Sequence, residues 1–438
     1  MMTAREAALK ALGAYRRSGS WSSLFLKNLF EKEKMDKRDA ALAVNICSGV
    51  LQNMSLCDFY ISAHCSTKAE KLEPIILDIL RLSVYQIAFL DKIPISAAVN
   101  EGVNLAKKYS KKASGLVNAV LRKVASNKEN LPIPDFGDTA KNLSVKYSHP
   151  EWLVKELLKV LSENECEEFL LLDNTAPKLW AQVNTVKTTT DLVIESIQKQ
   201  GYSAVKHELI PNCISIEGCG NVENLTVFSE GDIYIQDPAA RLSVIAADPK
   251  ENTSVIDGCA APGGKSFAAA VAMKNSGNIL SCDIHDNKLG LILSGAKRLG
   301  ISTINTRCLD GRNRVEELLV TADTVIADVP CSGLGVIRKK PEIRYKDEKE
   351  LFGLPKIQLD ILSNLSGYVK KGGTLLYSTC TILKRENEDV VKAFLELHPE
   401  FYTEDFTLPI GSSQNGQITL WPQKYGTDGF FICKMKKR

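Results

Sequence analysis

A short stretch near the middle of the chain, from Asp257 to Lys265, is the feature that most constrains the fold. It reads Asp-Gly-Cys-Ala-Ala-Pro-Gly-Gly-Lys, follows the apolar pair Val255-Ile256 and precedes an alanine-rich run from Ser266 to Met273. The pattern predicts a buried strand, a turn of small residues and then a helix, the order that opens a nucleotide-binding α/β unit. Its glycines allow sharp bends and close approach of a ligand to the backbone.

The two common phosphate-binding patterns do not fit this turn. Gly264-Lys265-Ser266 supplies the last three residues of a phosphate loop, but Cys259 stands where the leading glycine is needed, and G-x-G-x-x-G is also absent. S-adenosylmethionine (SAM) fits better, because its sulfonium and amino group suit a nearby carboxylate such as that of Asp257. We therefore favour a SAM site over a phosphate loop as the interpretation of this turn, and we favour either of them over a turn that binds no ligand.

Acidic residues end four successive predicted strands. After Asp257 come Asp283, Asp310 and Asp328, each at or just beyond the end of an apolar run. Asp283 follows Gly263 by 20 residues, a spacing typical of an acid that binds ribose hydroxyls. Because the carboxyl ends of parallel strands share one sheet edge, we expect these carboxylates around one ligand. The residues expected to bind the cofactor are Cys259, Ala260, Ala261, Pro262, Gly263, Gly264, Lys265, Asp283, Asp310 and Asp328.

Two of the twelve cysteines also lie at the tips of predicted strands. Cys331 follows Asp328-Val329-Pro330, and Cys380 ends the run 374–379, so both should project over the turn at 257–265. The other ten are expected to be buried small hydrophobes. No Cys-x-x-Cys pair occurs and the five histidines do not cluster with cysteines, so we expect neither a metal site nor a disulfide framework.

The front of the chain is helical by its apolar spacing and has a basic surplus. Three of its stretches, 81–86, 93–101 and 115–122, resemble the NusB family of RNA-binding antitermination factors, and this likeness concerns the fold more than the chemistry. Residues 1–150 hold 22 Lys and Arg against 14 Asp and Glu, whereas residues 151–438 hold 33 against 38. A basic front favours a polyanionic partner, although a solvated basic face gives the same count.

Composition and periodicity divide the chain into four parts. We expect an all-α NusB-like RNA-binding domain at 1–126, a linker at 127–146, a small α/β RNA-binding subdomain at 147–236 and a catalytic domain at 237–438. Regular alternation of strands and helices in the last part predicts an α/β doubly wound, Rossmann-like domain with a mostly parallel sheet. No apolar run reaches the length of a membrane span, so we expect a soluble, cytoplasmic protein, and a monomer.

The motifs at 257–265, 328–333 and 378–380 together resemble those of the SAM-dependent RNA 5-methylcytosine methyltransferases of the NOL1/NOP2/Sun family. With the NusB-like front, the likeness covers essentially the whole chain. It implies methylation of one cytosine in small-subunit (16S) ribosomal RNA, free or within the assembling subunit, by a doubly wound domain that follows a small RNA-binding subdomain.

The chemistry of that reaction needs a thiolate, because carbon 5 of cytosine becomes nucleophilic only after a thiolate adds to carbon 6. The resemblance implies that Cys380 is the nucleophile and that Cys331 assists product release, whereas analogy with DNA cytosine methyltransferases would favour Cys331 as the nucleophile. We expect Lys265 or a helix end to lower the pKa of Cys380, and Asp328 to hold the cytosine edge. Candidates for the RNA backbone, or else for a solvated loop, are Arg338, Lys339, Lys340 and Arg344.

Three other functions stay open on the sequence alone. The same reaction on tRNA or on large-subunit (23S) ribosomal RNA would need the same residues. A non-catalytic RNA-binding assembly factor would not need the intact acids and both cysteines. A phosphate-loop NTPase would bind ATP in place of SAM.

Overall fold

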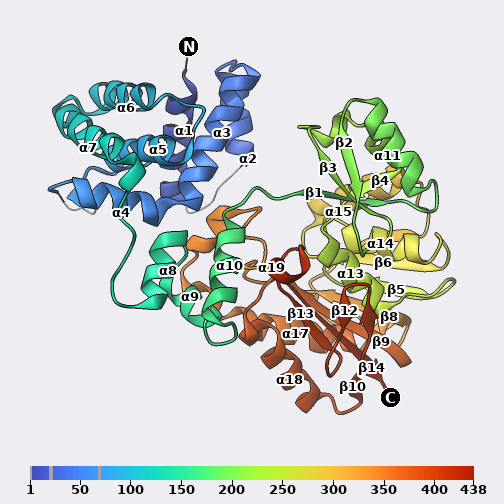
Figure 1. Cartoon of the computed structure of the whole chain (residues 1–438). Coiled ribbons are helices and arrows are strands. Elements are labelled where there is room, and N and C mark those ends of the chain that lie inside the picture. Colours follow the sequence, from blue (N-terminus) through green and yellow to red (C-terminus); the bar gives the residue numbers. More distant parts are fainter. Residues whose placement is uncertain (1, 19–22, 68–70) are drawn as a thin grey trace. The chain divides into compact units, whose positions relative to one another are not determined.

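The computed structural model describes residues 2–18, 23–67 and 71–438, and the chain divides into two compact units. Unit 1 comprises residues 1–175 together with the short segment 340–346, and unit 2 comprises residues 176–339 and 347–438. Figure 1 shows the helices of the first unit and the sheets of the second.

Unit 1 is built from α-helices around α5. Its buried residues, among them Ile79, Leu80 and Ile87, lie on several sides of the helix, and α5 packs against α1, α3, α4, α6 and α7. An all-α front was predicted from the apolar spacing, and it is confirmed. The helices are α1 (Ala4–Ser18), α2 (Ser23–Lys32), α3 (Lys37–Gln52), α4 (Met54–His64), α5 (Pro74–Phe89), α6 (Ile95–Tyr109), α7 (Ser114–Ser126), α8 (Thr139–Tyr147), α9 (Glu151–Leu157) and α10 (Glu163–Asp173).

Helix α8 begins inside the stretch 127–146 that was expected to be a linker. Asp138 caps it by accepting a hydrogen bond from the backbone of Lys141, and α8 packs against α4 within the same unit. Among the described residues no single helix is long and apolar enough to span a membrane, although the bent pair α3 and α4 passes that test together.

The segment 340–346 enters unit 1 through a buried arginine. The guanidinium of Arg344, fully shielded from solvent, donates hydrogen bonds to the carbonyl of Gln52 at 2.9 Å and to the side chain of Asn174 at 2.8 Å. Longer bonds reach the carbonyls of residues 147, 148 and 173. The neighbouring Tyr345 donates its hydroxyl to the carbonyl of Leu51 at 2.7 Å. The expectation that Arg344 contacts an RNA backbone is therefore wrong, because its donors satisfy carbonyls inside the protein.

Unit 2 begins with a small antiparallel sheet in the order β2-β3-β1-β4. Strand β1 pairs with both β3 and β4, and helix α11 follows it along the chain. The elements are β1 (Leu179–Val183), α11 (Thr190–Lys199), β2 (Ser203–Lys206), β3 (Cys213–Glu217), α12 (Thr226–Ser229) and β4 (Ile233–Ile235).

The large sheet of unit 2 has the order β10-β14-β9-β8-β5-β6-β7, with β13 paired to β14. The five strands from β5 to β9 are parallel, and β14 pairs antiparallel with β9, β10 and β13. Strand order reverses between β5 and β8, which is the switch point where such sheets bind ligands. The strands are β5 (Ser254–Asp257), β6 (Asn278–Asp283), β7 (Ile304–Cys308), β8 (Ala322–Asp328), β9 (Val369–Thr379), β10 (Phe401–Thr403), β13 (Gln417–Leu420) and β14 (Phe430–Lys437).

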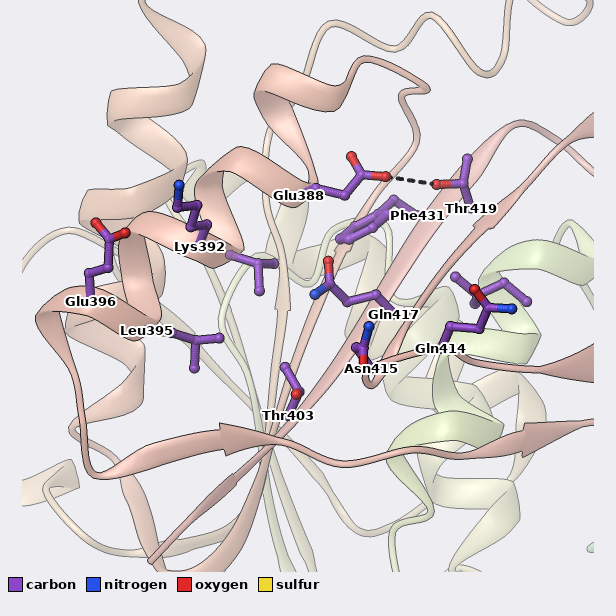
Figure 2. Close-up of a pocket in the computed structure, with 12 residues that line it drawn as sticks. Glu388, Lys392, Leu395, Glu396, Thr403, Gln414, Asn415, Gln417, Thr419 and Phe431 are labelled. Atoms are coloured by element: carbon purple, nitrogen blue, oxygen red, sulfur yellow. Dashed lines mark hydrogen bonds between the residues drawn. The ribbon is translucent and has the colours of Figure 1, made fainter. Parts of the chain in front are cut away.

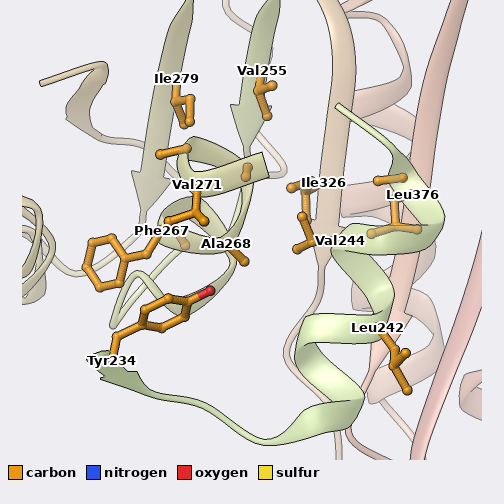
Figure 3. Packing of buried hydrophobic residues seen from close by; sticks show 14 of the residues in the cluster. Tyr234, Leu242, Val244, Val255, Phe267, Ala268, Val271, Ile279, Ile326 and Leu376 are labelled. Atoms are coloured by element: carbon orange, nitrogen blue, oxygen red, sulfur yellow. The ribbon is translucent and has the colours of Figure 1, made fainter. Parts of the chain in front are cut away.

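Helices cover both faces of this sheet, as predicted. Alternate residues of one strand face opposite sides, so Val255 packs into one core and Ile256 into the other. Figure 3 shows the first core, where α13 (Pro238–Ala247) and α14 (Gly264–Ala272) lie over the strands and α14 contributes the ring of Phe267. α15 (Asp286–Leu299) packs against β6 and β7, while α17 (Leu354–Ser366) and α18 (Glu388–Leu397) belong to the second core.

We expect Arg344→Ala to destabilise the protein by about 3 kcal/mol, because it leaves several buried carbonyls without donors. Urea unfolding of the full chain measures this loss, and Lys340→Ala, an exposed cation of the same segment, is the matched control. Unchanged stability of Arg344→Ala with a weakened affinity for RNA would contradict this role and restore the expected one.

Candidate active site

The carboxyl ends of the parallel strands surround a cavity of about 430 Å³ at the switch point. Asp283, Asp310 and Asp328 line it, and so do both Cys331 and Cys380. The structure thus brings together residues from the ends of β6, β7, β8 and β9 that are far apart in the sequence. Helix α17 closes one side with Ile357 and Ile361.

Asp257 does not line this cavity, contrary to its expected role near a sulfonium. Its side chain is fully buried, and its carboxylate accepts a hydrogen bond from the hydroxyl of Ser266 at 2.7 Å. Ser281 in turn donates to Ser266 at 2.7 Å. Burial raises the pKa of Asp257 to about 7, because the charged form is poorly solvated there. Through Ser266 this carboxyl links the end of β5 to α14 and β6, and it lies outside the cavity lining.

The glycines of the turn serve packing more than the approach of a ligand. A Cβ on Gly258 would lie 2.3 Å from Leu365, and one on Gly263 would lie 2.7 Å from Phe267. Gly263 also has a φ of 109°, in the region that other residues rarely adopt. Of the residues expected to bind the cofactor, Cys259 and Ala261 line the cavity with the three acids, whereas Ala260, Pro262, Gly263, Gly264 and Lys265 are not among its lining residues as described.

Asp283 and Asp310 are held in place by different partners. The carboxylate of Asp283 accepts hydrogen bonds from the backbone of Ala261 at 3.2 Å and of His285 at 2.9 Å. Asp310 forms a forked ion pair with Arg312, 2.6 Å at its shortest, and these hydrogen bonds lower the pKa of the carboxyl. Each oxygen of Asp283 accepts only one of these bonds and keeps a lone pair for a ligand hydroxyl, whereas both oxygens of Asp310 accept two bonds from Arg312.

Lys265 forms an ion pair with Asp328. Its ammonium is 2.6 Å from one oxygen of Asp328, while the hydroxyl of Ser378 donates to the other oxygen at 2.7 Å. The ammonium also lies 5.0 Å from the centre of the Phe430 ring. This lysine therefore balances the charge of Asp328.

The two thiols are in direct contact, with 3.2 Å between the Sγ atoms of Cys331 and Cys380. A hydrogen bond from Cys331 lowers the pKa of Cys380, and the charge of Lys265 acts in the same direction. The same hydrogen bond, with burial and the charge of Glu386, raises the pKa of Cys331. Lys265 or a helix end was expected to lower this pKa, and the charge of Lys265 does so with a smaller effect than the hydrogen bond from Cys331. Cys380 is the thiol that this arrangement activates.

Cys259 also lines the cavity but lacks this activation. Burial raises the pKa of its thiol, and the nearby carboxylates of Asp257, Asp328 and Asp283 raise it further. A thiol in such surroundings stays protonated and is a poor nucleophile.

A buried carboxylate that sequence reasoning missed lies next to the thiols. Glu386 is fully shielded from solvent and accepts hydrogen bonds from the backbone of Ser332 at 2.9 Å and from the side chain of Gln358 at 2.8 Å. It belongs to the charged run 384–389, Lys-Arg-Glu-Asn-Glu-Asp. No local signal in such a run separates a buried acid from a solvated one.

The other three basic residues expected at RNA differ in their exposure and in their ion pairs. Lys339 lies between Asp237 and Asp428, at 2.6 Å and 2.7 Å, so its charge is used inside unit 2. Unlike Arg344, Lys339 is exposed, so its role at the RNA backbone stays a prediction. Arg338 is half-buried and Lys340 is exposed.

A larger cavity of about 690 Å³ lies elsewhere in unit 2 (Figure 2). Glu388 and Lys392 of α18 and Gln417 and Thr419 of β13 line it. It contains neither cysteine of the pair and none of the strand-end acids. The smaller cavity is therefore the candidate active site.

Comparison with known proteins places the chain in a family. A model described as 16S rRNA methyltransferase RsmB/F matches residues 244–436, and a NusB family model matches residues 2–126. A model of the ferredoxin-like domain of RsmF/B-like methyltransferases matches residues 149–223.

Relatives and a solved structure match nearly the whole chain. The probable ribosomal RNA small subunit methyltransferase B of Bacillus subtilis (strain 168) is 35% identical over 444 residues, which cover 99% of this chain and 98% of that protein. A protein of the same description from Synechocystis is 30% identical over 449 residues, 100% of each chain. The crystal structure of PH0851 has a TM-score of 0.81 and 28% identity over 99% of this chain and 98% of that one.

The doubly wound sheet, the cavity at its switch point and these matches define a methyltransferase with a NusB-like domain and a ferredoxin-like subdomain. The chain belongs to the ribosomal RNA small subunit methyltransferase B family. The predicted fold classes of all three parts and the resemblance found in the sequence are confirmed.

We expect Cys331→Ala to raise the pKa of Cys380, because the thiolate loses its hydrogen-bond donor. Alkylation of Cys380 by iodoacetamide, followed by mass spectrometry of its peptide, should slow near neutral pH and recover at high pH. Cys308→Ala, which removes an exposed thiol outside the cavity, should leave the profile unchanged. An identical profile for Cys331→Ala would contradict the assigned activation.

Proposed function

We propose that this chain methylates carbon 5 of a specific cytosine in small-subunit (16S) ribosomal RNA, using SAM and a covalent bond between Cys380 and the base. The observation that carries the proposal is the contact between the Cys331 and Cys380 thiols, 3.2 Å apart, beside the carboxylate of Asp328. Ribosomal RNA as the substrate is supported by the names of the relatives, which are described as ribosomal RNA methyltransferases. The expectations of a cytoplasmic monomer stay predictions.

The cavity has the chemistry that SAM requires. Its volume of about 430 Å³ lies within the range of small-molecule sites. Asp283, already fixed by two backbone amides, can accept from ribose hydroxyls, and Asp310 lies beside it at the end of β7. Leu309 and Ile361 supply apolar surface for a base. When bound, SAM supplies the electrophilic methyl group.

The residues of the chain then carry out covalent catalysis. The thiolate of Cys380 adds to carbon 6 of the cytosine, and Asp328 holds the edge of the base so that the ring accepts electron density. Carbon 5 becomes the nucleophile that receives the methyl group. A base must then remove the proton from carbon 5, and the electron pair of that bond re-forms the ring double bond as the thiolate of Cys380 leaves carbon 6. Cys331, in contact with Cys380, assists this last step.

The RNA-binding roles of the other parts follow the same proposal. The NusB-like domain holds the basic surplus of the chain, and cationic side chains bind the phosphate backbone without reading sequence. The match of residues 149–223 to a ferredoxin-like domain of RsmF/B-like methyltransferases supports RNA binding by the small subdomain as well.

The rival functions differ from this one in measurable ways. Bisulfite sequencing of RNA from cells with and without the gene separates small-subunit RNA from tRNA and large-subunit RNA. A non-catalytic assembly factor has no use for an activated thiol, and the paired thiols therefore favour an enzyme. Calorimetry with SAM and with ATP separates the methyltransferase from an NTPase.

We expect Asp283→Asn to weaken SAM binding about tenfold or more, because hydrogen bonds to a charged acceptor contribute roughly 1.5–3 kcal/mol each. Titration calorimetry of the free enzyme with SAM measures the change. Asp286→Asn, an exposed acid at the start of α15, is the control. An unchanged affinity in a folded Asp283 variant would remove this residue from the cofactor site.

We expect the two cysteine variants to fail at different steps. Cys380→Ala should abolish both methylation and any covalent adduct, since the attacking thiolate is gone. Cys331→Ala should still attack and transfer the methyl group, so a protein–RNA conjugate should accumulate as a retarded band on a denaturing gel. Adduct formation by Cys380→Ala but not by Cys331→Ala would reverse the roles. Full methylation by both variants would refute covalent catalysis.

A further inference from the structure

Glu386 is a fully buried carboxylate whose hydrogen bonds reach both cysteine-bearing segments. One of its oxygens accepts from the backbone of Ser332 at 2.9 Å and from Gln358 at 2.8 Å, and the other accepts from Thr381 at 3.4 Å. The backbone carbonyl of Glu386 accepts the hydroxyl of Tyr377 at 2.5 Å. All these donors are neutral groups, and together they hold Glu386 between the two segments.

These partners are the immediate neighbours of the two thiols. Ser332 follows Cys331 in the chain and Thr381 follows Cys380, and the hydroxyls of Ser332 and Thr381 lie 2.7 Å apart. Gln358, from α17, donates both to Glu386 and to the carbonyl of Pro330 at 3.1 Å. One carboxylate therefore joins the loop after β8, the loop after β9 and a helix.

We propose that Glu386 is a positioning residue that holds the Cys331 and Cys380 segments together and directs the Cys331 thiol towards Cys380. The inference rests on the roles proposed above for the two cysteines. Glu386 does not line the active-site cavity, so it acts through its neighbours.

Electrostatics supports the same direction. The negative charge of Glu386 opposes ionisation of Cys331 and raises the pKa of that thiol, along with the hydrogen bond to Cys380 and burial. Cys380 instead faces Lys265, whose charge favours its thiolate, and the acids Asp328 and Asp428, which oppose it. The phenol of Tyr377 lies close to both Cys331 and Glu386 and stays protonated, because burial raises its pKa. The charge of Lys265 therefore favours ionisation of Cys380, whereas the charge of Glu386 opposes ionisation of Cys331.

The test is the reactivity of the thiols in Glu386→Gln, measured on the full chain without RNA or SAM. Glutamine keeps the size and one acceptor oxygen but removes the charge and adds a donor opposite existing donors. We expect the ratio of iodoacetamide alkylation at Cys380 to that at Cys331 near pH 7 to fall about fivefold, the equivalent of about 1 kcal/mol. The pH profile of Cys331 should shift to lower pH.

Glu388→Gln is the matched control, because Glu388 is a nearby acid whose carboxylate accepts from Thr419 and lines the other cavity. It should leave both profiles unchanged. If Glu386→Gln does not fold, Gln358→Ala, which removes only one donor, should lower the same ratio in the folded protein. An unchanged ratio and unchanged profiles in the folded variant would overturn the proposal. Alkylation of the thiols is measured without substrate, so its result does not depend on methylation. A failure of the wild-type protein to methylate RNA would instead overturn the proposed function.

Discussion

The parallel pairing of β8 with β9 is the constraint on which the active site depends. Asp328 lies opposite Ser378 in this register, and the chain leaves β8 three residues before Cys331 and β9 one residue before Cys380. The 3.2 Å contact between the thiols follows from that register. Because side chains alternate between the two faces of a sheet, a slip of one residue would turn Ser378 away from Asp328 and separate the sulfurs. The fold and the chemistry are therefore fixed by the same hydrogen-bonded ladder.

Buried charged side chains also determine which segments of the chain lie together. An isolated ion in a protein interior is costly, so each buried charge must have partners. Lys265 has Asp328, Glu386 has three neutral donors, and Arg344 has carbonyls. In unit 2 these partners lie on different strands and loops, and a buried charge thereby determines which segments meet. This is why residues with no direct contact to a substrate are needed to shape the site.

Much of this architecture was predictable, because apolar periodicity depends only on local sequence. The unit around Asp257–Lys265 and the acids at successive strand ends were predicted, and three of those acids line one cavity. The sequence placed Asp257 at the correct sheet edge but did not show that its side chain faces Ser266. No strand after residue 380 was predicted, and β13 and β14 complete the sheet there.

The errors share a physical cause. The basic residues from 338 to 344 form a run that predicts a solvated or RNA-facing loop by composition alone, yet Lys339 pairs with two acids and Arg344 is buried. The charged run around Glu386 is equally uninformative. Whether a charged side chain is solvated or enclosed depends on segments that are distant in sequence. Local patterns contain no information on such contacts.

The distribution of charge along the chain also supports the proposed division of RNA binding. Residues 151–438 hold 33 Lys and Arg against 38 Asp and Glu, so this part of the chain has no net attraction for a polyanion. Its Lys265 and Lys339 are further committed to acids beside them. The first 150 residues, with 22 against 14, have the opposite balance. Under the proposed function a polyanion has to reach an acid-lined cavity, and a separate basic domain would supply the cationic surplus without disturbing the carboxylates.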